Sequence, residues 1–249
     1  MNETALHQLH IDFAWGLFVG QFEDNVLHRH YALQISVSSN ESFNIRDEFG
    51  STTSYKMCFI NSNVPHQYQS QETSLIILIN PLSSLGHQLY TSFRLIRIKS
   101  LEDLLSPISF LFKSYLNKEF SFSEFVNRVR AYLHDFQCQC EKDNHFEDDR
   151  IYNAIQYLDK NCDRIVSLKE IASYCYLSET RFLHLFKEKT NLNFRRYQLW
   201  NKLIKSLPYL RKHSITTTAH EFGFTDSSHY SHTFKETFGL NPKLLFRKE

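Results

Sequence analysis

The chain has 249 residues, with 42% apolar and 15% aromatic positions, and its 28 Lys and Arg nearly balance 27 Asp and Glu. This composition excludes a disordered or collagen-like chain, because such chains bury too little apolar surface to offset the entropy lost on ordering. No apolar run approaches the ~20 residues of a membrane span, and no basic and apolar leader stands at the N-terminus. The sequence therefore predicts a globular cytoplasmic protein, and its length favours two domains.

Alternating apolar residues dominate from Phe13 to about Ile98. A period of two indicates strands, and short strands at this spacing are typical of a β-sandwich or barrel. Glu48 to Gly50 is a plausible turn between two of them. The expected strands include the segments around Trp15–Val19, Leu33–Val37, Phe43–Ile45, Lys56–Ile60 and Ser74–Ile79.

Helical spacing begins at Leu101, where apolar residues follow one helix face to Tyr115 and Pro107 predicts a kink. A second helix is expected from Ser121, which forms a capping box with Glu124. Its apolar stripe extends to Phe136. These apolar stripes could face a core or form the interface of a dimer, and both interpretations stay open.

The five cysteines are an odd number without CxxC spacing, which predicts reduced thiols. Cys138 and Cys140 are a weak candidate for a redox or metal pair, because side chains two apart on a helix point away from each other. An acidic stretch from Glu141 to Asp149 has the composition of a linker.

The net charge of +1 conceals a division between the two parts of the chain. Residues 150–249 contain 17 basic and 9 acidic side chains, a net charge of +8, whereas residues 1–149 have a net charge of −7. An anionic partner is therefore expected on the C-terminal part, with a merely solvated basic face as the alternative.

An internal repeat occupies this basic part. The segment 186–193 (FKEKTNLN) aligns with 234–241 (FKETFGLN) at an offset of 48, and 167–172 (SLKEIA) aligns with 214–219 (SITTTA) at an offset of 47. Two matching blocks in the same order indicate a duplication. The slip of one residue falls between the blocks, where a turn can accommodate it.

Each copy predicts a short helix, a tight turn and a second helix. In the first copy Ser167 and Ser178 are expected N-caps, and Asn191 ends the second helix. In the second copy Gly223 makes the turn, Asp226 caps, and Gly239 stops the helix. The residues expected to face inward are Phe182, Leu185 and Phe186 in the first copy, and Tyr230, Thr233, Phe234 and Phe238 in the second.

This pattern is that of the helix-turn-helix, whose second helix enters the DNA major groove. A helical bundle with solvated faces is the alternative. The outward positions, and so the candidate DNA-binding residues, are Glu179, Thr180, Leu183, His184 and Lys187 in the first copy, and Ser227, Ser228, Ser231, His232 and Lys235 in the second.

Residues 151–246 resemble the DNA-binding region of AraC-type (AraC/XylS family) transcription regulators. The resemblance rests on LKEIA from Leu168, LSETRFLHLFK from Leu177 and, above all, AHEFGFTDSSHYSHTFKETFGLNP from Ala219. It implies two helix-turn-helix subdomains joined by a long helix. Three departures stand out. Asn191 replaces the usual Gly, Pro208 is expected to end the connecting helix near Leu207, and the second copy's outward positions have Ser and His where many relatives have Arg or Gln.

Three histidines in the acidic part could converge in a small barrel: His28 and His30, just before an expected strand, and His66, at the end of another. A His-x-His pair with a later His resembles the metal motif of cupins, a barrel that regulators of this family often carry. Gln34 stands where a metal enzyme would have a carboxylate. We therefore expect pocket-lining or structural histidines and no metal, with Trp15, Leu33, Ile35 and Phe59 as the apolar lining.

The expected fold is α+β, with a cupin-like β-barrel for sensing (1–98), a helical dimerisation or linker region (99–140) and an all-α AraC-type DNA-binding domain with two helix-turn-helix motifs (150–249). The expected function is sequence-specific transcription regulation, without enzymatic activity or a cofactor. Expected partners are double-stranded DNA, a small-molecule effector, a second copy of the chain and RNA polymerase, but no membrane. The alternative is a metal-dependent cupin enzyme fused to a DNA-binding region. A purely helical interaction module does not explain why the +8 charge coincides with the repeats.

Overall fold

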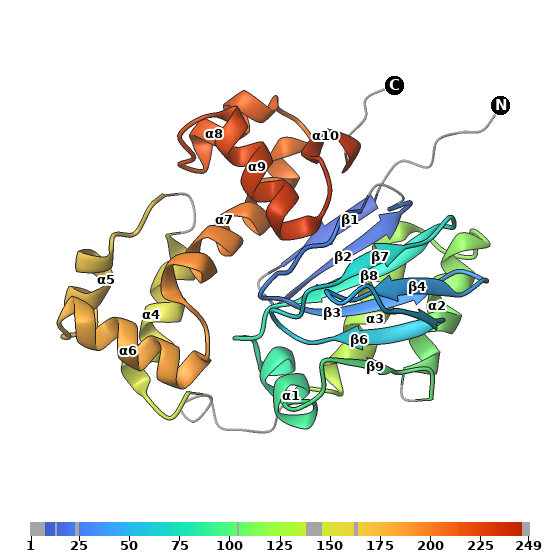
Figure 1. The fold of residues 1–249 in the computed structure, drawn as a ribbon, viewed down its shortest axis with the longest axis horizontal. Helices are drawn as coiled ribbons and strands as arrows, with labels where there is room; N and C mark the ends of the chain where they lie inside the picture. Colours follow the sequence, from blue (N-terminus) through green and yellow to red (C-terminus); the bar gives the residue numbers. More distant parts are fainter. Residues whose placement is uncertain are drawn as a thin grey trace. The chain divides into compact units, whose positions relative to one another are not determined.

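The computed structural model (Figure 1) describes residues 8–12, 14–22, 25–103, 105–137, 146–161 and 164–245. Cys138, Cys140 and Cys162 lie outside these residues, as does most of the expected linker. The chain forms two compact units. Unit 1 comprises Met1–Gln137 and Thr233–Glu249, and unit 2 comprises Cys138–His232. None of the helices in the described part of the chain has the length and apolarity that crossing a membrane requires.

Unit 1 contains two antiparallel sheets, one with six strands in the order β1-β2-β8-β3-β6-β9 and one with three in the order β5-β4-β7. The predicted strands are present, and Gly50, with a φ of +86°, lies in the predicted turn between β4 and β5. A closed barrel was expected, but the described strands form two separate open sheets. The strands are β1 (Gln8–Ile11), β2 (Trp15–Gly20), β3 (Leu33–Ser38), β4 (Phe43–Arg46), β5 (Thr52–Tyr55), β6 (Met57–Ile60), β7 (Gln67–Gln69), β8 (Ser74–Ile79) and β9 (Ile98–Ser100).

The central strands of the large sheet are buried on both faces. One face contributes Leu17, Ile35 and other apolar side chains to the core. On the other face Ser74 of β8 accepts a hydrogen bond of 2.7 Å from the hydroxyl of Tyr68 on β7, which ties the small sheet to the large one. This second layer is why the polar residues of β3, Gln34 and Ser36, are buried.

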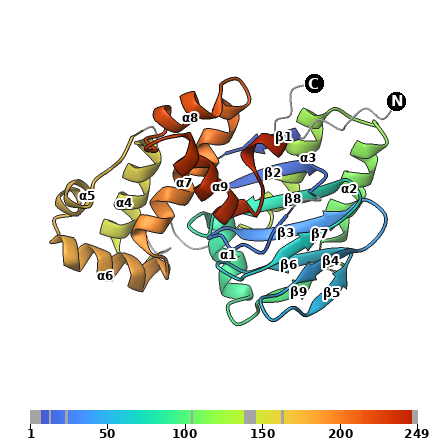
Figure 2. The same ribbon diagram turned by 45° about the horizontal axis from the view of Figure 1, so that its top comes forward.

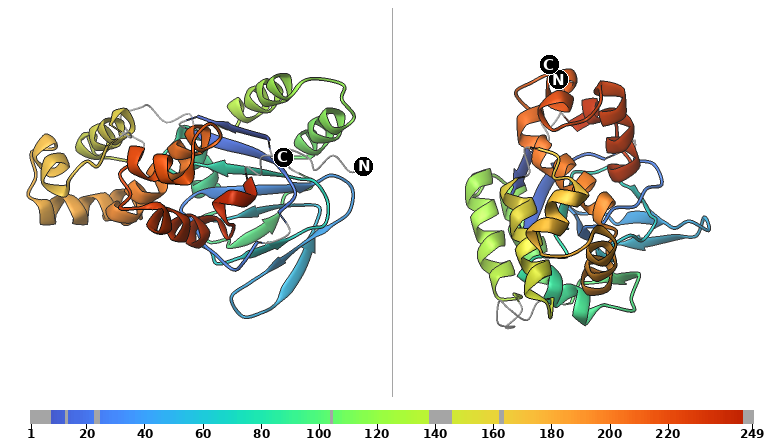
Figure 3. Two further views of the ribbon diagram at one scale, coloured as in Figure 1. Left: turned by 90° about the horizontal axis from the view of Figure 1, so that it is seen from above. Right: turned by 90° about the vertical axis from the view of Figure 1, so that its left-hand side faces the viewer.

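Three helices complete the N-terminal part of unit 1: α1 (Ser84–Ser92), α2 (Ser106–Leu116) and α3 (Phe122–His134). Helices α2 and α3 lie on one side of the large sheet (Figure 3), and Phe112 and Phe125 are fully buried in the same core as its strands. The core interpretation of both stripes is confirmed. Ser121 caps α3 as predicted, accepting from the Glu124 N–H at 3.2 Å. The expected kink at Pro107 is absent, because α2 begins at Ser106 and a proline in the first turn removes no helical hydrogen bond.

Unit 1 also includes the end of the chain from residue 233. The backbone N–H of Val26 donates to the carbonyl of Gly239 at 2.9 Å, and the side-chain amide of Asn25 donates to the carbonyl of Phe238 at 2.9 Å. Gly239 has a φ of +69°, and a Cβ there would lie 2.5 Å from Nδ1 of His28. A glycine is therefore required at this position both by its backbone conformation and by its neighbours.

Unit 2 is helical. Its helix α7 is long and connects the group formed by α4, α5 and α6 to α8 (Figure 2). The prediction that α7 ends near Leu207 is wrong, because the helix continues through Pro208 to Leu210. The proline removes the hydrogen bond to the carbonyl four residues earlier, and the helix ends two residues after it. The helices are α4 (Asp149–Lys160), α5 (Leu168–Tyr174), α6 (Glu179–Thr190), α7 (Phe194–Leu210) and α8 (Ile215–Glu221), followed by α9 (Ser227–Phe238), which continues into unit 1, and α10 (Pro242–Leu245).

Two of the cysteines lie in the described parts of these units, and both are free and buried. The prediction of reduced thiols is confirmed for Cys58 and Cys175. Burial raises the pKa of the Cys175 thiol to about 11, so this thiol stays protonated and unreactive near neutral pH.

Candidate nucleic-acid interface

The two repeat copies fold into the same turn, hydrogen bond by hydrogen bond. After α5 the N–H of Leu177 donates to the carbonyl of Ala172 at 2.9 Å, and after α8 the N–H of Phe224 donates to that of Ala219 at 2.8 Å. Tyr176 and Gly223 precede these donors, and both have a left-handed φ, +56° and +67° respectively. The offset of 47 predicted from the sequence therefore holds through both turns.

Side-chain caps start the helices of both copies as the sequence predicted. Ser167 caps α5 and Ser178 caps α6, accepting from backbone N–H groups at 3.1 and 3.3 Å. Asp226 takes the place of Ser178 in the second copy, and its carboxylate accepts from the N–H groups of Ser228 and His229, both at 2.8 Å. Thr225 is therefore the extra residue, because it separates the second turn from the second cap.

Aromatic side chains form the interior of each copy. The rings of Phe182 and Phe186 meet the ring of Phe194 edge to face, with centroids 5.0 and 5.4 Å apart. In the second copy Tyr230 is fully buried, and its hydroxyl is 2.7 Å from that of Ser206 on α7. The sequence correctly predicted which faces are buried, since Leu185, Thr233, Phe234 and Phe238 are buried as well.

The predicted outward residues of α6 share one surface of that helix. Glu179, Thr180, His184 and Lys187 are exposed, whereas Leu183 is half-buried. Their spacing of three and four residues places them on neighbouring turns of one face, as a groove-reading helix requires. Leu183 has only part of its side chain available for an apolar contact.

The corresponding surface of α9 has shorter side chains, and one of its hydroxyl groups is already hydrogen-bonded within the helix. Ser228, His232 and Lys235 are exposed, but Ser227 and Ser231 are half-buried. The hydroxyl of Ser231 donates to the carbonyl of Ser227 at 2.7 Å, so its proton is already used within the helix. Ser231 keeps only its acceptor capacity for an outside partner.

Several exposed cations beside these faces were missing from the predicted set. Arg181 lies on α6, and Arg195 and Arg196 lie in the first turn of α7. The net charge of +8 indicated that exposed cations are present, but the apolar periodicity did not show which of them lie near the two helix faces.

Other cations in unit 2 already have partners. Arg164 is bonded to the carboxylate of Glu170 and to the hydroxyl of Tyr157, and Lys205 pairs with Asp159. The Arg164 guanidinium, with the Tyr157 hydroxyl, lowers the pKa of Glu170 to about 2. These basic residues are therefore engaged in ion pairs within unit 2.

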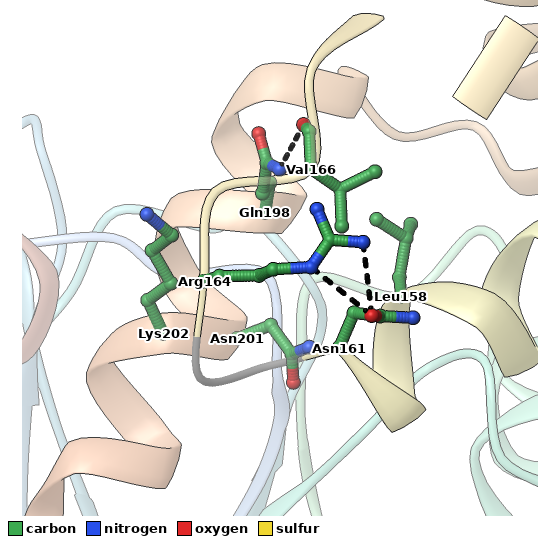
Figure 4. A pocket seen from close by; sticks show the side chains of 7 residues that line it. All are labelled: Leu158, Asn161, Arg164, Val166, Gln198, Asn201 and Lys202. Carbon is green, nitrogen blue, oxygen red and sulfur yellow. Dashed lines mark hydrogen bonds between the residues drawn. The ribbon is translucent and has the colours of Figure 1, made fainter. Parts of the chain in front are cut away.

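A small hollow lies where α4, the following loop and α7 meet (Figure 4), lined by residues such as Asn161, Arg164 and Lys202. Its space of about 10 Å³ suits a single water and no effector. Gln198 donates across it to the carbonyl of Val166 at 2.6 Å. Burial lowers the pKa of Lys202, which is consistent with a structural position on α7.

The structure brings His28, His30 and His66 together in unit 1. All three are buried, and one ring nitrogen of each lies within 4.8 Å of the other two. Burial and the neighbouring His30 lower the pKa of His28 to about 3. Burial also lowers the pKa of His30, and burial with the charges of its two neighbours lowers that of His66 well below its usual value. All three imidazoles are therefore neutral at physiological pH.

Known proteins are similar to this chain in the part that contains the repeat. A family model described as "Helix-turn-helix domain" matches residues 171–248. The regulatory protein PocR of Salmonella typhimurium is 26% identical over 98 residues, which are 39% of this chain and 32% of PocR. The HTH-type transcriptional activator RhaS of Escherichia fergusonii is 33% identical over 98 residues, or 39% of this chain and 35% of RhaS. The matches thus span about a third of each relative.

The described fold is also similar to that of solved structures over most of the chain. An apo variant of ToxT from Vibrio cholerae has a TM-score of 0.60 at 15% identity, with 94% of this chain and 97% of that chain covered. Wild-type ToxT with an unsaturated fatty acid bound has a TM-score of 0.54 at 14% identity, with 94% and 95% covered. Residues 171–248 therefore match a helix-turn-helix domain, and the chain shares the α+β fold of the ToxT structures.

Proposed function

We propose that this protein is a sequence-specific DNA-binding transcription regulator that reads its operator with two helix-turn-helix units, α5 with α6 and α8 with α9. The observation that carries the proposal is the pair of equivalent turns, each followed by a capped helix of 12 residues with an exposed polar face. In a helix-turn-helix the second helix enters the major groove. The similarity to PocR and RhaS, both named as regulators, supports the same conclusion.

The base-contacting residues in this proposal are the exposed ones of α6 and α9, above all His184 and His232, which occupy equivalent positions. Lys187 and Lys235 are equivalent too and suit phosphate contacts, as do Arg195 and Arg196 at the start of α7. Phosphate contacts fix the protein on the duplex, and base contacts supply the sequence preference.

We assign one function to each of the predicted domains. Residues 1–98 sense a small molecule, 99–140 form a dimerisation or linker region, and 150–249 bind DNA. The fatty acid bound to ToxT supports a small-molecule effector for this chain. We also propose a homodimer, because helix-turn-helix dimers place paired readers on repeated half-sites. A contact with RNA polymerase is a further proposed interaction.

The decisive experiment is the selection of DNA fragments from a random duplex library by the purified full chain. We expect enrichment of one motif with two elements spaced by about one helical turn, as two linked readers require. A variant with Thr180→Ala, His184→Ala and Lys187→Ala should lose one element and keep the other. Retention of duplexes without any enriched motif would contradict sequence-specific reading.

A further inference from the structure

We propose that His28, His30 and His66 form a binding site for a divalent transition-metal cation such as Zn²⁺. Three imidazoles from two separate loops converge in the interior of unit 1, with their ligand atoms within 4.8 Å of one another. Imidazole nitrogen suits zinc, copper, iron and nickel, whereas calcium and magnesium prefer oxygen ligands. The proposal departs from the expectation of no metal that Gln34 suggested.

The backbone holds two of the histidines side by side. His28 and His66 form an isolated antiparallel bridge, in which each N–H donates to the other residue's carbonyl, at 3.0 and 2.9 Å. Their ring centroids lie 4.4 Å apart, and the ring of His30 lies 5.6 and 5.2 Å from them. The backbone thus sets the spacing of the cluster before any ligand binds.

Hydrogen bonds to the backbone orient the rings in the way typical of metal ligands. Nδ1 of His28 is 2.9 Å from the carbonyl of Val26, and Nδ1 of His66 is 2.8 Å from the carbonyl of Val64. A carbonyl only accepts, so each Nδ1 is the protonated nitrogen and each Nε2 keeps its lone pair. Histidines that bind metals usually have their other nitrogen fixed by such a bond.

His66 shows the consequence most clearly. Its ring is fully buried, and Nε2 has no hydrogen-bond partner. A buried polar atom without a partner destabilises the folded state, which is why such atoms are rare in folded proteins. A cation held among the three rings would give this lone pair a partner.

His30 is the third histidine of the cluster, and both of its ring nitrogens have neighbours. Its Nδ1 is 3.1 Å from the carbonyl of Ala32 and its Nε2 is 2.9 Å from Oε1 of Gln34, while the Gln34 amide nitrogen donates to Ser36 at 2.8 Å. A neutral imidazole has one proton for two nitrogens. When Nδ1 donates to the carbonyl of Ala32, the Gln34 amide can turn so that its nitrogen donates to Nε2, or Nε2 can give its lone pair to a cation instead.

Coordination of a cation requires the three ligand atoms to move closer together than the 4.8 Å within which they lie. Zn²⁺ binds histidine nitrogen at about 2.0–2.1 Å, so tetrahedral ligands stand roughly 3.3 Å apart. Three protein ligands leave a fourth position, for which Gln34 Oε1 is the nearest candidate from the chain.

The test uses the untagged full chain, stripped with a chelator and titrated with Co²⁺ and then Zn²⁺. We expect one Co²⁺ per chain, with the visible absorption of a low-symmetry cobalt site, and stoichiometric loss of that absorption when Zn²⁺ is added. His66→Ala should weaken binding by at least about 100-fold, since even outer-shell changes cost 10–100-fold. The matched control is His134→Ala, an exposed histidine of α3, which should change nothing.

Circular dichroism of each variant separates lost ligands from lost folding, and the more conservative His66→Gln provides a second variant. The proposal is overturned if the stripped wild-type chain binds no Co²⁺, or if its cobalt spectrum persists in both His66 variants. Equal weakening by His134→Ala would likewise overturn it, because binding would then be on the surface. The readout does not involve DNA, so failure here leaves the proposed regulatory function standing.

Discussion

Tyr176 occupies a backbone conformation that suits glycine. Its φ is +56°, and the equivalent residue in the second turn is Gly223. A left-handed conformation costs a residue with a Cβ roughly 1 kcal/mol or more. The side chain of Tyr176 is 95% exposed, so it contributes little packing in return.

We expect Tyr176→Gly to raise the free energy of unfolding of unit 2 by up to about 1 kcal/mol, less the entropy that glycine adds to the unfolded chain. Chemical denaturation of the full chain measures this difference. Tyr176→Ala is the matched control, because it removes the ring but keeps the Cβ, and it should give no gain. An equal gain from both variants would assign the cost to the exposed ring and not to the backbone.

His184 and His232 are exposed at equivalent positions of α6 and α9. If each contacts a base edge, replacing it with Ala should weaken binding to the selected operator by about 1–3 kcal/mol more than binding to random DNA. Fluorescence anisotropy with both duplexes at one salt concentration measures the difference. His220→Ala, an exposed histidine of α8, is the control. Equal losses on both duplexes would make the histidine a phosphate contact.

At the scale of elements, each reader depends on a small aromatic interior. Phe186 and Phe234 are fully buried and equivalent by the offset of 48. Truncation of either to Ala should cost about 3–5 kcal/mol, because a small core collapses poorly around the cavity. Thermal unfolding measures the loss, and Phe110→Ala, on the exposed face of α2, should leave the midpoint unchanged. An unchanged thermal midpoint in Phe186→Ala would show that this aromatic interior does not contribute to the stability of the folded chain.

Local signals predicted much of the architecture at this scale. Caps such as Ser121, Ser178 and Asp226 act through backbone groups three residues away or fewer, so the sequence nearby is sufficient to predict them. Pro107 and Pro208 were misjudged because the effect of a proline depends on its position within the helix, which periodicity places only to within a few residues.

The spacing of apolar and polar residues did not predict which strands pair over long distances in the sequence. The small sheet pairs β4 with both β5 and β7, and it covers the polar face of β3. Nothing in the spacing of Gln34 and Ser36 signals that second layer. The convergence of the histidines was predictable as a hypothesis, but the unpartnered Nε2 of His66 depends on backbone bonds between segments 38 residues apart.

At the scale of the molecule, the division of charge decides how DNA binding responds to salt. The net charge of +8 lies in residues 150–249, and residues 1–149 have a net charge of −7. With about five phosphates neutralised, a plot of log K against log salt should have a slope near −4 to −5. Because the acidic part contacts no phosphate in this proposal, the full chain and residues 150–249 should give the same slope and differ only in affinity.

Single charge removals identify which cations are involved. Arg195→Gln, at an exposed position in the first turn of α7, should reduce the magnitude of the slope by about 1 if its guanidinium neutralises a phosphate. Lys113→Gln, an equally exposed cation on α2 of unit 1, changes the net charge of the chain by the same amount and should leave the slope unchanged. Filter binding or anisotropy over a series of salt concentrations measures both slopes. If the two variants shift the slope equally, the whole chain's charge and not the basic part would govern the association, and the assignment of the phosphate contacts to α6, α7 and α9 would be wrong.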